Sequence, residues 1–151
     1  MPNWCYNRIT IYGDEKTEAK LKEIEKIFEK ADPFNQIFPI PDFKNIPNEK
    51  GELPKLEQRL NPDGSVFYET YNFPDGTNDD RWYHWCIANW GTKWDVSELC
   101  VEYADDEQLE LTFSTAWSPP EGIIQKLREK YPDLSFSCFY DEPGMEVAGY
   151  Y

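Results

Sequence analysis

The strongest constraint on the fold is a pair of adjacent segments in which apolar and polar residues alternate strictly. In residues 97–103 (SELCVEY) and 109–114 (LELTFS), every second side chain is apolar. A period of two predicts β-strands that bury one face, and the intervening ADDEQ is typical of a hairpin turn. With a later strand at 134–140, the residues expected to face a core are Leu99, Val101, Tyr103, Leu109, Leu111, Phe113, Leu134, Phe136 and Cys138.

Helical periodicity appears in two further segments. Residues 13–31 and 119–131 each place apolar side chains on one stripe, and the second begins with prolines suited to a first helical turn. A β-branched and aromatic segment at 3–12 precedes the first helix, and a strand-like tail at 145–151 ends the chain. This order predicts an α+β fold, the ferredoxin-like sandwich, with helices on one face of an antiparallel sheet. At 151 residues the chain is expected to form one domain.

An irregular, proline-rich insertion is expected at about 32–78. Within it, KLEQRL, the turn NPDG and SVFYETY predict a β-hairpin. The following DRWYHWCIANW (80–90) predicts a helix that is aromatic on almost every side and therefore largely buried. Gly91 comes next, where a left-handed helix cap is needed.

The charge balance restricts the partners of this chain. With 29 acidic and 15 basic residues, its net charge is -14, which repels phosphate backbones and anionic lipids. We therefore expect neither direct nucleic-acid binding nor a membrane partner, and the pattern leaves the oligomeric state open. No apolar run approaches a membrane span and no secretory leader is visible, so a soluble protein of the bacterial cytoplasm is expected.

Sequence motifs for chemistry are sparse. The four cysteines, Cys5, Cys86, Cys100 and Cys138, stand far apart, which favours reduced core thiols over a metal or cluster site. His84 is the only histidine, and no nucleophile stands near it in the sequence. The acidic runs lack the spacing of a calcium loop. We predict no catalytic residue, no metal and no cofactor.

Two interpretations remain open for ANWGTKWD (88–95) and TAWSPP (115–120). In the architectural one, the tryptophans pack, Ser118 caps the helix that begins at Pro119, and Lys93 pairs with Asp95 or with neighbouring charges. In the other, indole rings and nearby polar groups form a small-ligand or enzyme site. The candidate ligand-binding residues are Asn89, Trp90, Thr92, Lys93, Trp94, Asp95, Trp117 and Ser118.

Acidic residues concentrate on the two alternating strands and their turn. The candidate protein-interaction residues are Glu98, Glu102, Asp105, Asp106, Glu107 and Glu110. We expect the open face of the sheet to present three of them with Thr112, Ser114, Ser135 and Ser137, which suits a basic protein partner and not RNA. A purely solubilising surface is the alternative.

Four motifs occur together in a recognisable order: MPNWCYNRITIYG, NWGTKWD, TAWSPP and EPGMEVAG. With them the chain resembles the plasmid- and phage-borne YubB-like family, whose members are described as carrying a ferredoxin-like domain. The resemblance implies a protein of mobile genetic elements with no assigned activity, and the shortage of catalytic motifs favours an accessory protein that is not an enzyme. It carries over no catalytic residue, and residues 44–78 match nothing in that family.

Overall fold

A computed structural model describes residues 2–151, which fold into two compact units. The first comprises residues 2–39 and 86–151, and the second is Ile40–Trp85. The insertion expected at about 32–78 therefore corresponds to a unit of its own that begins later and extends further along the chain. Between residues 2 and 151, no helix is long and apolar enough to cross a membrane.

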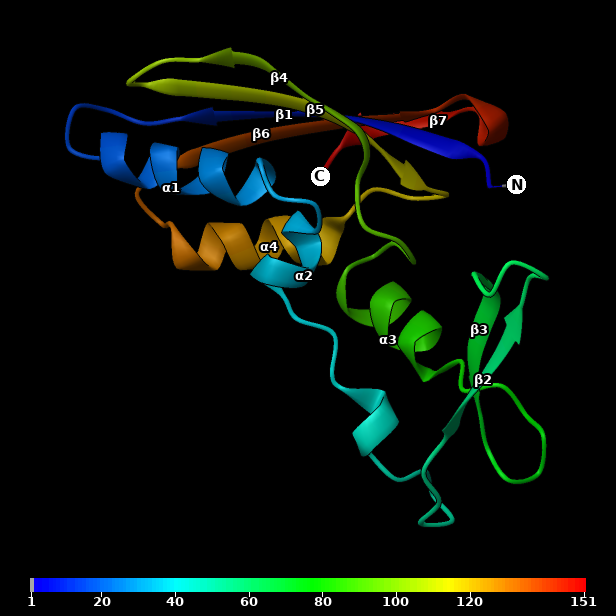
Figure 1. Ribbon diagram of the computed structural model, residues 1–151. Coiled ribbons are helices and arrows are strands. Elements are labelled where there is room, and N and C mark those ends of the chain that lie inside the picture. Colours follow the sequence, from blue (N-terminus) through cyan, green and yellow to red (C-terminus); the bar gives the residue numbers. More distant parts are fainter. Residues whose placement is uncertain (1) are drawn as a thin grey trace. The chain divides into compact units, whose positions relative to one another are not determined.

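The first unit contains a five-stranded antiparallel sheet with helices on one face (Figure 1). In the sheet the strand order is β4-β5-β1-β6-β7. This arrangement confirms the predicted ferredoxin-like fold, with β7 added at one edge. The elements are β1 (Trp4–Tyr12), α1 (Glu18–Phe28), α2 (Pro33–Ile37), β4 (Ser97–Ala104), β5 (Gln108–Ala116), α4 (Glu121–Lys130), β6 (Ser135–Glu142), the 3-10 turn η2 (Pro143–Met145) and β7 (Val147–Tyr150).

An aromatic chain fills the space between the sheet and its helices. The ring of Phe113 on β5 stacks against Phe28 of α1, and Phe34 of α2 meets Phe113 and Trp90 edge-on at 5.7 and 5.8 Å between ring centroids. As predicted, Leu109, Leu111, Phe113, Leu134 and Cys138 are buried. Phe34 draws residues 33–37 into this core, which is why they do not belong to the insertion.

Strand β4 departs from the predicted alternation. Two β-bulges shift its register against β5, and Glu98 adopts a left-handed backbone with φ of 53°. The second bulge places Tyr103 opposite Glu110, on the open face, so its predicted inward position is wrong. Val101 pairs with Leu111, which places it on the predicted face, but it is exposed, because β4 is an edge strand and has a neighbour on one side only.

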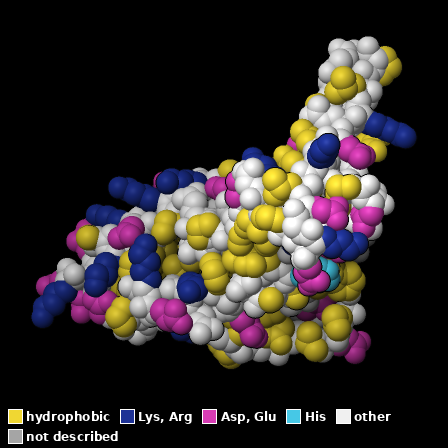
Figure 2. All heavy atoms as spheres, turned by 90° about the horizontal axis from the view of Figure 1, so that it is seen from below, with side chains coloured by type: hydrophobic (Ala, Val, Ile, Leu, Met, Phe, Trp, Pro, Cys, Tyr) yellow, Lys and Arg dark blue, Asp and Glu magenta, His cyan; other side chains and the backbone are white. Residues whose placement is uncertain are grey.

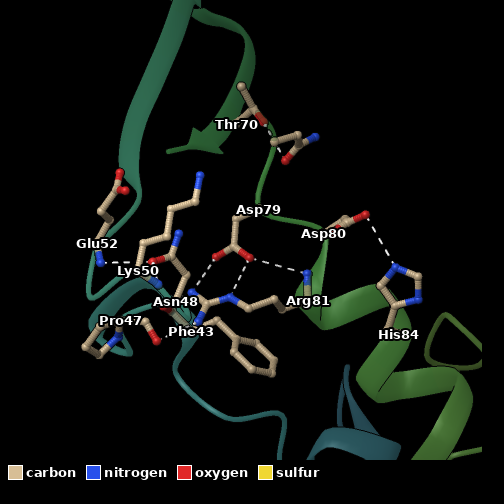
Figure 3. A network of polar contacts seen from close by, with 11 residues as sticks. Phe43, Pro47, Asn48, Lys50, Glu52, Thr70, Asp79, Asp80, Arg81 and His84 are labelled. Carbon is tan, nitrogen blue, oxygen red and sulfur yellow. Dashed lines mark hydrogen bonds and ion pairs between the residues drawn. The ribbon is translucent and has the colours of Figure 1, made fainter. Parts of the chain in front are cut away.

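The second unit contains the 3-10 turn η1 (Phe43–Asn45), the predicted hairpin of β2 (Lys55–Leu60) and β3 (Val66–Asn72), and the first turns of α3 (Arg81–Asn89). Arg81 joins these parts (Figure 3): its guanidinium forms two hydrogen bonds with the Asp79 carboxylate, at 2.8 and 2.9 Å, and donates to the carbonyl of Phe43. The Arg81 guanidinium also lowers the pKa of Asp79.

Helix α3 is less buried than its sequence predicted. Cys86 is its buried residue, whereas Trp82, Tyr83 and Ile87 are exposed. The boundary between the two units falls within this helix, so neither core has to cover it on every side. His84 is also exposed and lies 3.4 Å from Asp80 one turn away (Figure 3).

Three of the four cysteines are buried, but Cys100 is exposed, which corrects the expectation that all are core thiols. Burial raises the pKa of Cys5, Cys86 and Cys138 to about 11. The neighbouring Glu102 raises the pKa of the Cys100 thiol as well.

We expect one thiol per folded chain, that of Cys100, to react with Ellman's reagent, because the other three are inaccessible to it. All four should react once the chain is unfolded in guanidinium chloride. The Cys100→Ser variant should show no rapid phase. Rapid reaction of more than one thiol with the reagent in the folded protein would contradict the described burial of the other three.

Candidate functional site

The motif NWG and the start of α4 lie against each other through their backbones. The amide of Gly122 donates to the carbonyl of Trp90 at 3.0 Å, and a Cβ added at Gly122 would lie 1.7 Å from the carbonyl oxygen of Asn89. Gly91 has φ of 90°, so the predicted left-handed cap is confirmed. This close approach explains why residues 89–91 (NWG) and 118–122 (SPPEG) lie together in the fold. The glycines Gly91 and Gly122 have no side chain, so the end of α3 and the start of α4 can touch.

Most polar groups of the candidate ligand-binding set are used in such architecture. The indole N–H of Trp90 donates to the backbone carbonyl of Phe38 at 2.8 Å. The hydroxyl of Thr92 donates to the backbone carbonyl of Ala116 at 2.9 Å. Ser118 donates to the carbonyl of Gly91 and makes no side-chain cap on α4, so its predicted capping role is wrong.

Asp95 and Lys93 do not pair with each other. The Asp95 carboxylate accepts from the backbone amides of Phe34 and Asn35, both at 3.1 Å, and thereby caps α2. Burial raises the pKa of this carboxyl group. The Lys93 ammonium lies 4.2 Å from the ring centroid of Trp94, a cation–π contact at the surface.

The two remaining tryptophans of these motifs, Trp94 and Trp117, are exposed. The expectation that Trp117 packs in the core is therefore wrong. Asn89 lines a hollow of about 480 Å³ between the end of α3 and α4, together with Gly91, Glu121 and Lys126. A ligand-binding role for the eight candidate residues stays a prediction.

The open face of the sheet is a second candidate site, and the registers of the paired strands show which side chains lie on it. Residues opposite one another in an antiparallel pair point to the same face, so β1 adds four side chains to the acidic ones expected from β4 and β5. The residues on the open face include Tyr6, Arg8, Thr10 and Tyr12 from β1, Glu98, Cys100, Glu102 and Tyr103 from β4, Glu110, Thr112 and Ser114 from β5, Ser135, Ser137, Phe139 and Asp141 from β6, and Ala148 and Tyr150 from β7.

Aromatic side chains make this face different from the one expected. Tyr6, Tyr12, Tyr103 and Tyr150 are all exposed, and Tyr150 stands edge-on to Phe139 with 5.2 Å between their ring centroids. The expectation from the sequence covered polar residues of β4, β5 and β6, placed Tyr103 on the opposite face, and left out β1 and β7. The signal was present in β1, where Tyr6, Arg8, Thr10 and Tyr12 occupy every second position.

A hollow of about 340 Å³ lies in the middle of the open face. It is lined by Tyr6, Asn7, Arg8, Glu98, Thr112, Phe113, Ser114, Phe139 and Asp141. Arg8 is the one base among these residues, and its Nε lies 3.9 Å from the Glu110 carboxylate.

The acidic candidates divide between the face and the turn that joins β4 to β5. Glu98 lines the hollow, Glu102 accepts from the Thr112 hydroxyl at 2.7 Å, and Glu110 faces Arg8. Asp105 has a structural part in the turn: it accepts from the hydroxyl of Tyr103, which lowers the pKa of Asp105, and from two backbone amides. Asp106 and Glu107 are exposed beside it.

The helix side of the molecule carries a different charge pattern. Figure 2, which views the molecule from that side, shows Lys and Arg side chains interspersed with Asp and Glu. On α1, on α4 and in the turn after α4, these charges form ion pairs, namely Lys22 with Glu18, Lys130 with Glu23 and Lys20 with Asp133. The acids of the open face, in contrast, have Arg8 as their basic neighbour.

Comparisons with known proteins agree with this fold. No curated protein matches the chain. The crystal structure of the protein Api92 from Yersinia pseudotuberculosis matches with a TM-score of 0.52 over 99% of this chain and 93% of that one, at 11% sequence identity. Such a likeness shows the fold alone. The family model described as a ferredoxin-like domain in Api92-like protein matches residues 70–151, more than half of the sequence. The chain therefore belongs to this Api92-like family of ferredoxin-like domains.

Proposed function

We propose that the open face of the sheet is a docking surface for a basic segment of another protein. The observation that carries the proposal is the composition of this face: Glu98, Glu102, Glu110 and Asp141 stand among exposed tyrosines, with Arg8 as the neighbouring base. Such a face attracts lysine and arginine side chains through their charge and offers aromatic rings for cation–π contacts. The protein acts in this proposal by binding, without catalysis.

The biological setting is the other part of the proposal. The motifs that resemble the YubB-like family support an accessory protein of a phage or plasmid that works in the cytoplasm of a bacterial host. A partner that normally holds nucleic acid suits this setting, because its binding surface is basic. The acidic face would then compete with nucleic acid for that surface.

Replacing Glu98, Glu102 and Glu110 together by glutamine is expected to slow binding of a synthetic peptide in which arginine and serine alternate. Electrostatic steering raises association rates at low salt, and removing three charges should lower the rate about tenfold. The salt dependence of the rate should flatten as well, because fewer charges are left for salt to screen. Surface plasmon resonance over a salt series measures both quantities.

A matched variant separates the face from total charge. Glu15, Glu29 and Glu129 are exposed and lie outside the sheet, so their replacement by glutamine removes the same charge elsewhere. This control should bind nearly as fast as the parent. Equal rates and equal salt slopes for all three proteins would mean that the acidic face only solubilises the chain, and the residues at 89–95 and 115–118 would then become the stronger candidate.

A further inference from the structure

We propose that the hollow at Glu98 and Asp141 receives the guanidinium group of an arginine side chain from the docked segment. This inference rests on the proposed function and makes it specific: a single arginine serves as the anchor, and other basic residues only add charge. The hollow has about 340 Å³ of space and combines carboxylates, aromatic rings and hydroxyl groups in its lining. Arginine is the side chain that can use all three.

The two carboxylates stand on opposite sides of the hollow. Asp141 pairs with Tyr6, Tyr6 pairs with Ser114, and Ser114 pairs with Ser97, which precedes Glu98 in β4. Three strand spacings of about 4.8 Å thus separate the two acidic strands. The bulge in β4 and the left-handed backbone of Glu98 accompany the turn of its side chain toward this hollow. In residues 2–151 neither carboxylate forms an ion pair.

Ser114 supplies an independent indication of a ligand. Its side chain lines the hollow although the residue is only 4% exposed. Within the described part of the chain no group hydrogen-bonds its hydroxyl. This hydroxyl opens into the space where the guanidinium would lie, so it is free to bond a ligand there. It can accept one of the five N–H donors of arginine.

The remaining lining completes a site for a flat cation. Tyr6 and Phe139 present rings to the hollow, and a guanidinium stacks on such rings more readily than an ammonium does. Arg8 also borders the hollow, but its Nε faces Glu110, and its guanidinium is largely exposed. It can therefore donate to backbone carbonyls of the docked segment while the anchor arginine lies between the two acids.

Three peptides that differ only in one central residue, arginine, lysine or citrulline, test the proposal by isothermal titration. The arginine peptide is expected to bind about tenfold more tightly than the lysine peptide, because a planar guanidinium can stack on the rings of Tyr6 and Phe139 while it donates to a carboxylate, whereas an ammonium is a compact charge. Citrulline keeps the shape and loses the charge, so its binding should fall below that of lysine. Amide shifts of Tyr6, Ser114 and Phe139 on arginine binding should locate the site by NMR.

The variant Glu98→Gln with Asp141→Asn should reduce the preference for arginine over lysine to about twofold or less, because the lining of the hollow then has no carboxylate to accept the paired N–H groups of a guanidinium. Ser114→Ala, a mild change, should weaken arginine binding more than lysine binding. Asp106→Asn with Glu107→Gln removes the same charge from the hairpin turn and should leave the preference unchanged. An equal preference in all these variants would overturn the arginine site while leaving the docking surface intact. Failure of every basic peptide to bind at low salt would overturn both.

Discussion

Replacing Trp90 by alanine is expected to lower the free energy of unfolding by about 3 to 5 kcal/mol. The indole is 2% exposed and packs edge-on against Phe34, which in turn packs on Phe113. Truncation therefore opens a cavity at the junction of α2 and the sheet. It also removes the hydrogen bond that the indole N–H donates to the carbonyl of Phe38.

Trp117→Ala is the matched control for this change. Trp117 is 45% exposed, so its removal should cost about 0.5 kcal/mol or less. Urea unfolding followed by far-UV circular dichroism compares the two variants without relying on tryptophan fluorescence. Parental stability of the Trp90 variant would contradict the architectural interpretation of ANWGTKWD. Loss of binding to some ligand at unchanged stability would favour the ligand-binding interpretation.

The elements of the ferredoxin-like unit were predictable because each one carries a complete local pattern. Strand β5 alternates throughout, and α1 and α4 repeat apolar residues at helical spacing. Helix α2 could not be predicted in the same way. It has five residues, and its cap is the carboxylate of Asp95, more than fifty residues further along the chain. Such a helix depends on tertiary contacts and has little local signal.

The same distinction explains the errors in β4. Its apolar residues alternate correctly in the sequence, but two bulges insert extra residues and reverse the direction of Tyr103. A bulge depends on the pairing with β5 and leaves no clear mark in the pattern of one strand. Ser118 was misassigned for a related reason: the sequence places it before a helix, whereas Gly91 from another segment accepts its hydroxyl.

For the candidate site, the sequence pattern predicted the acidic charge but not the full set of residues that form the surface around it. Six acidic residues were expected, and all of them lie on β4, β5 or their turn. Apart from Tyr103 on β4, the aromatic residues come from β1, β6 and β7, and only the strand order brings them beside Glu98 and Glu110. The density of acidic residues along the sequence can thus indicate the sign of the charge on a partner. Which basic side chain the site prefers depends on residues from distant strands.

A second large effect is expected in the unit Ile40–Trp85, where Arg81→Ala should destabilise the fold by about 3 to 5 kcal/mol. Asp79 has only 5% of its side chain exposed and depends on the two hydrogen bonds from Arg81. The guanidinium also lies over the rings of Phe43 and Phe73, 5.0 and 5.3 Å from their centroids. Its loss leaves a buried carboxylate unpaired and removes the link between η1 and the start of α3.

Hydrogen exchange with mass spectrometry should detect this effect where it occurs. Amides of the hairpin and of residues 43–48 should lose protection in the Arg81 variant, while those of β1 and β5 keep theirs, because the two units have separate cores. Arg59→Ala is a suitable control, since Arg59 is an exposed arginine in the same unit. Unchanged protection of the hairpin in the Arg81 variant would contradict the proposed importance of this ion pair.

The pH dependence of the same unit gives an independent test of the Asp79–Arg81 pair. Arg81 lowers the folded-state pKa of Asp79 below its ordinary value of about 3.9. The pair should therefore stabilise the unit at pH values above about 4, and this contribution should disappear as the pH falls through the folded-state pKa. The parent and Asp79→Asn should differ in hairpin protection at neutral pH and converge in acid. Asp80→Asn changes an exposed acid next in sequence and should follow the parent at neutral pH. A difference between the parent and Asp79→Asn that persists unchanged well below pH 4 would show that the asparagine acts through altered packing and not through loss of the ion pair.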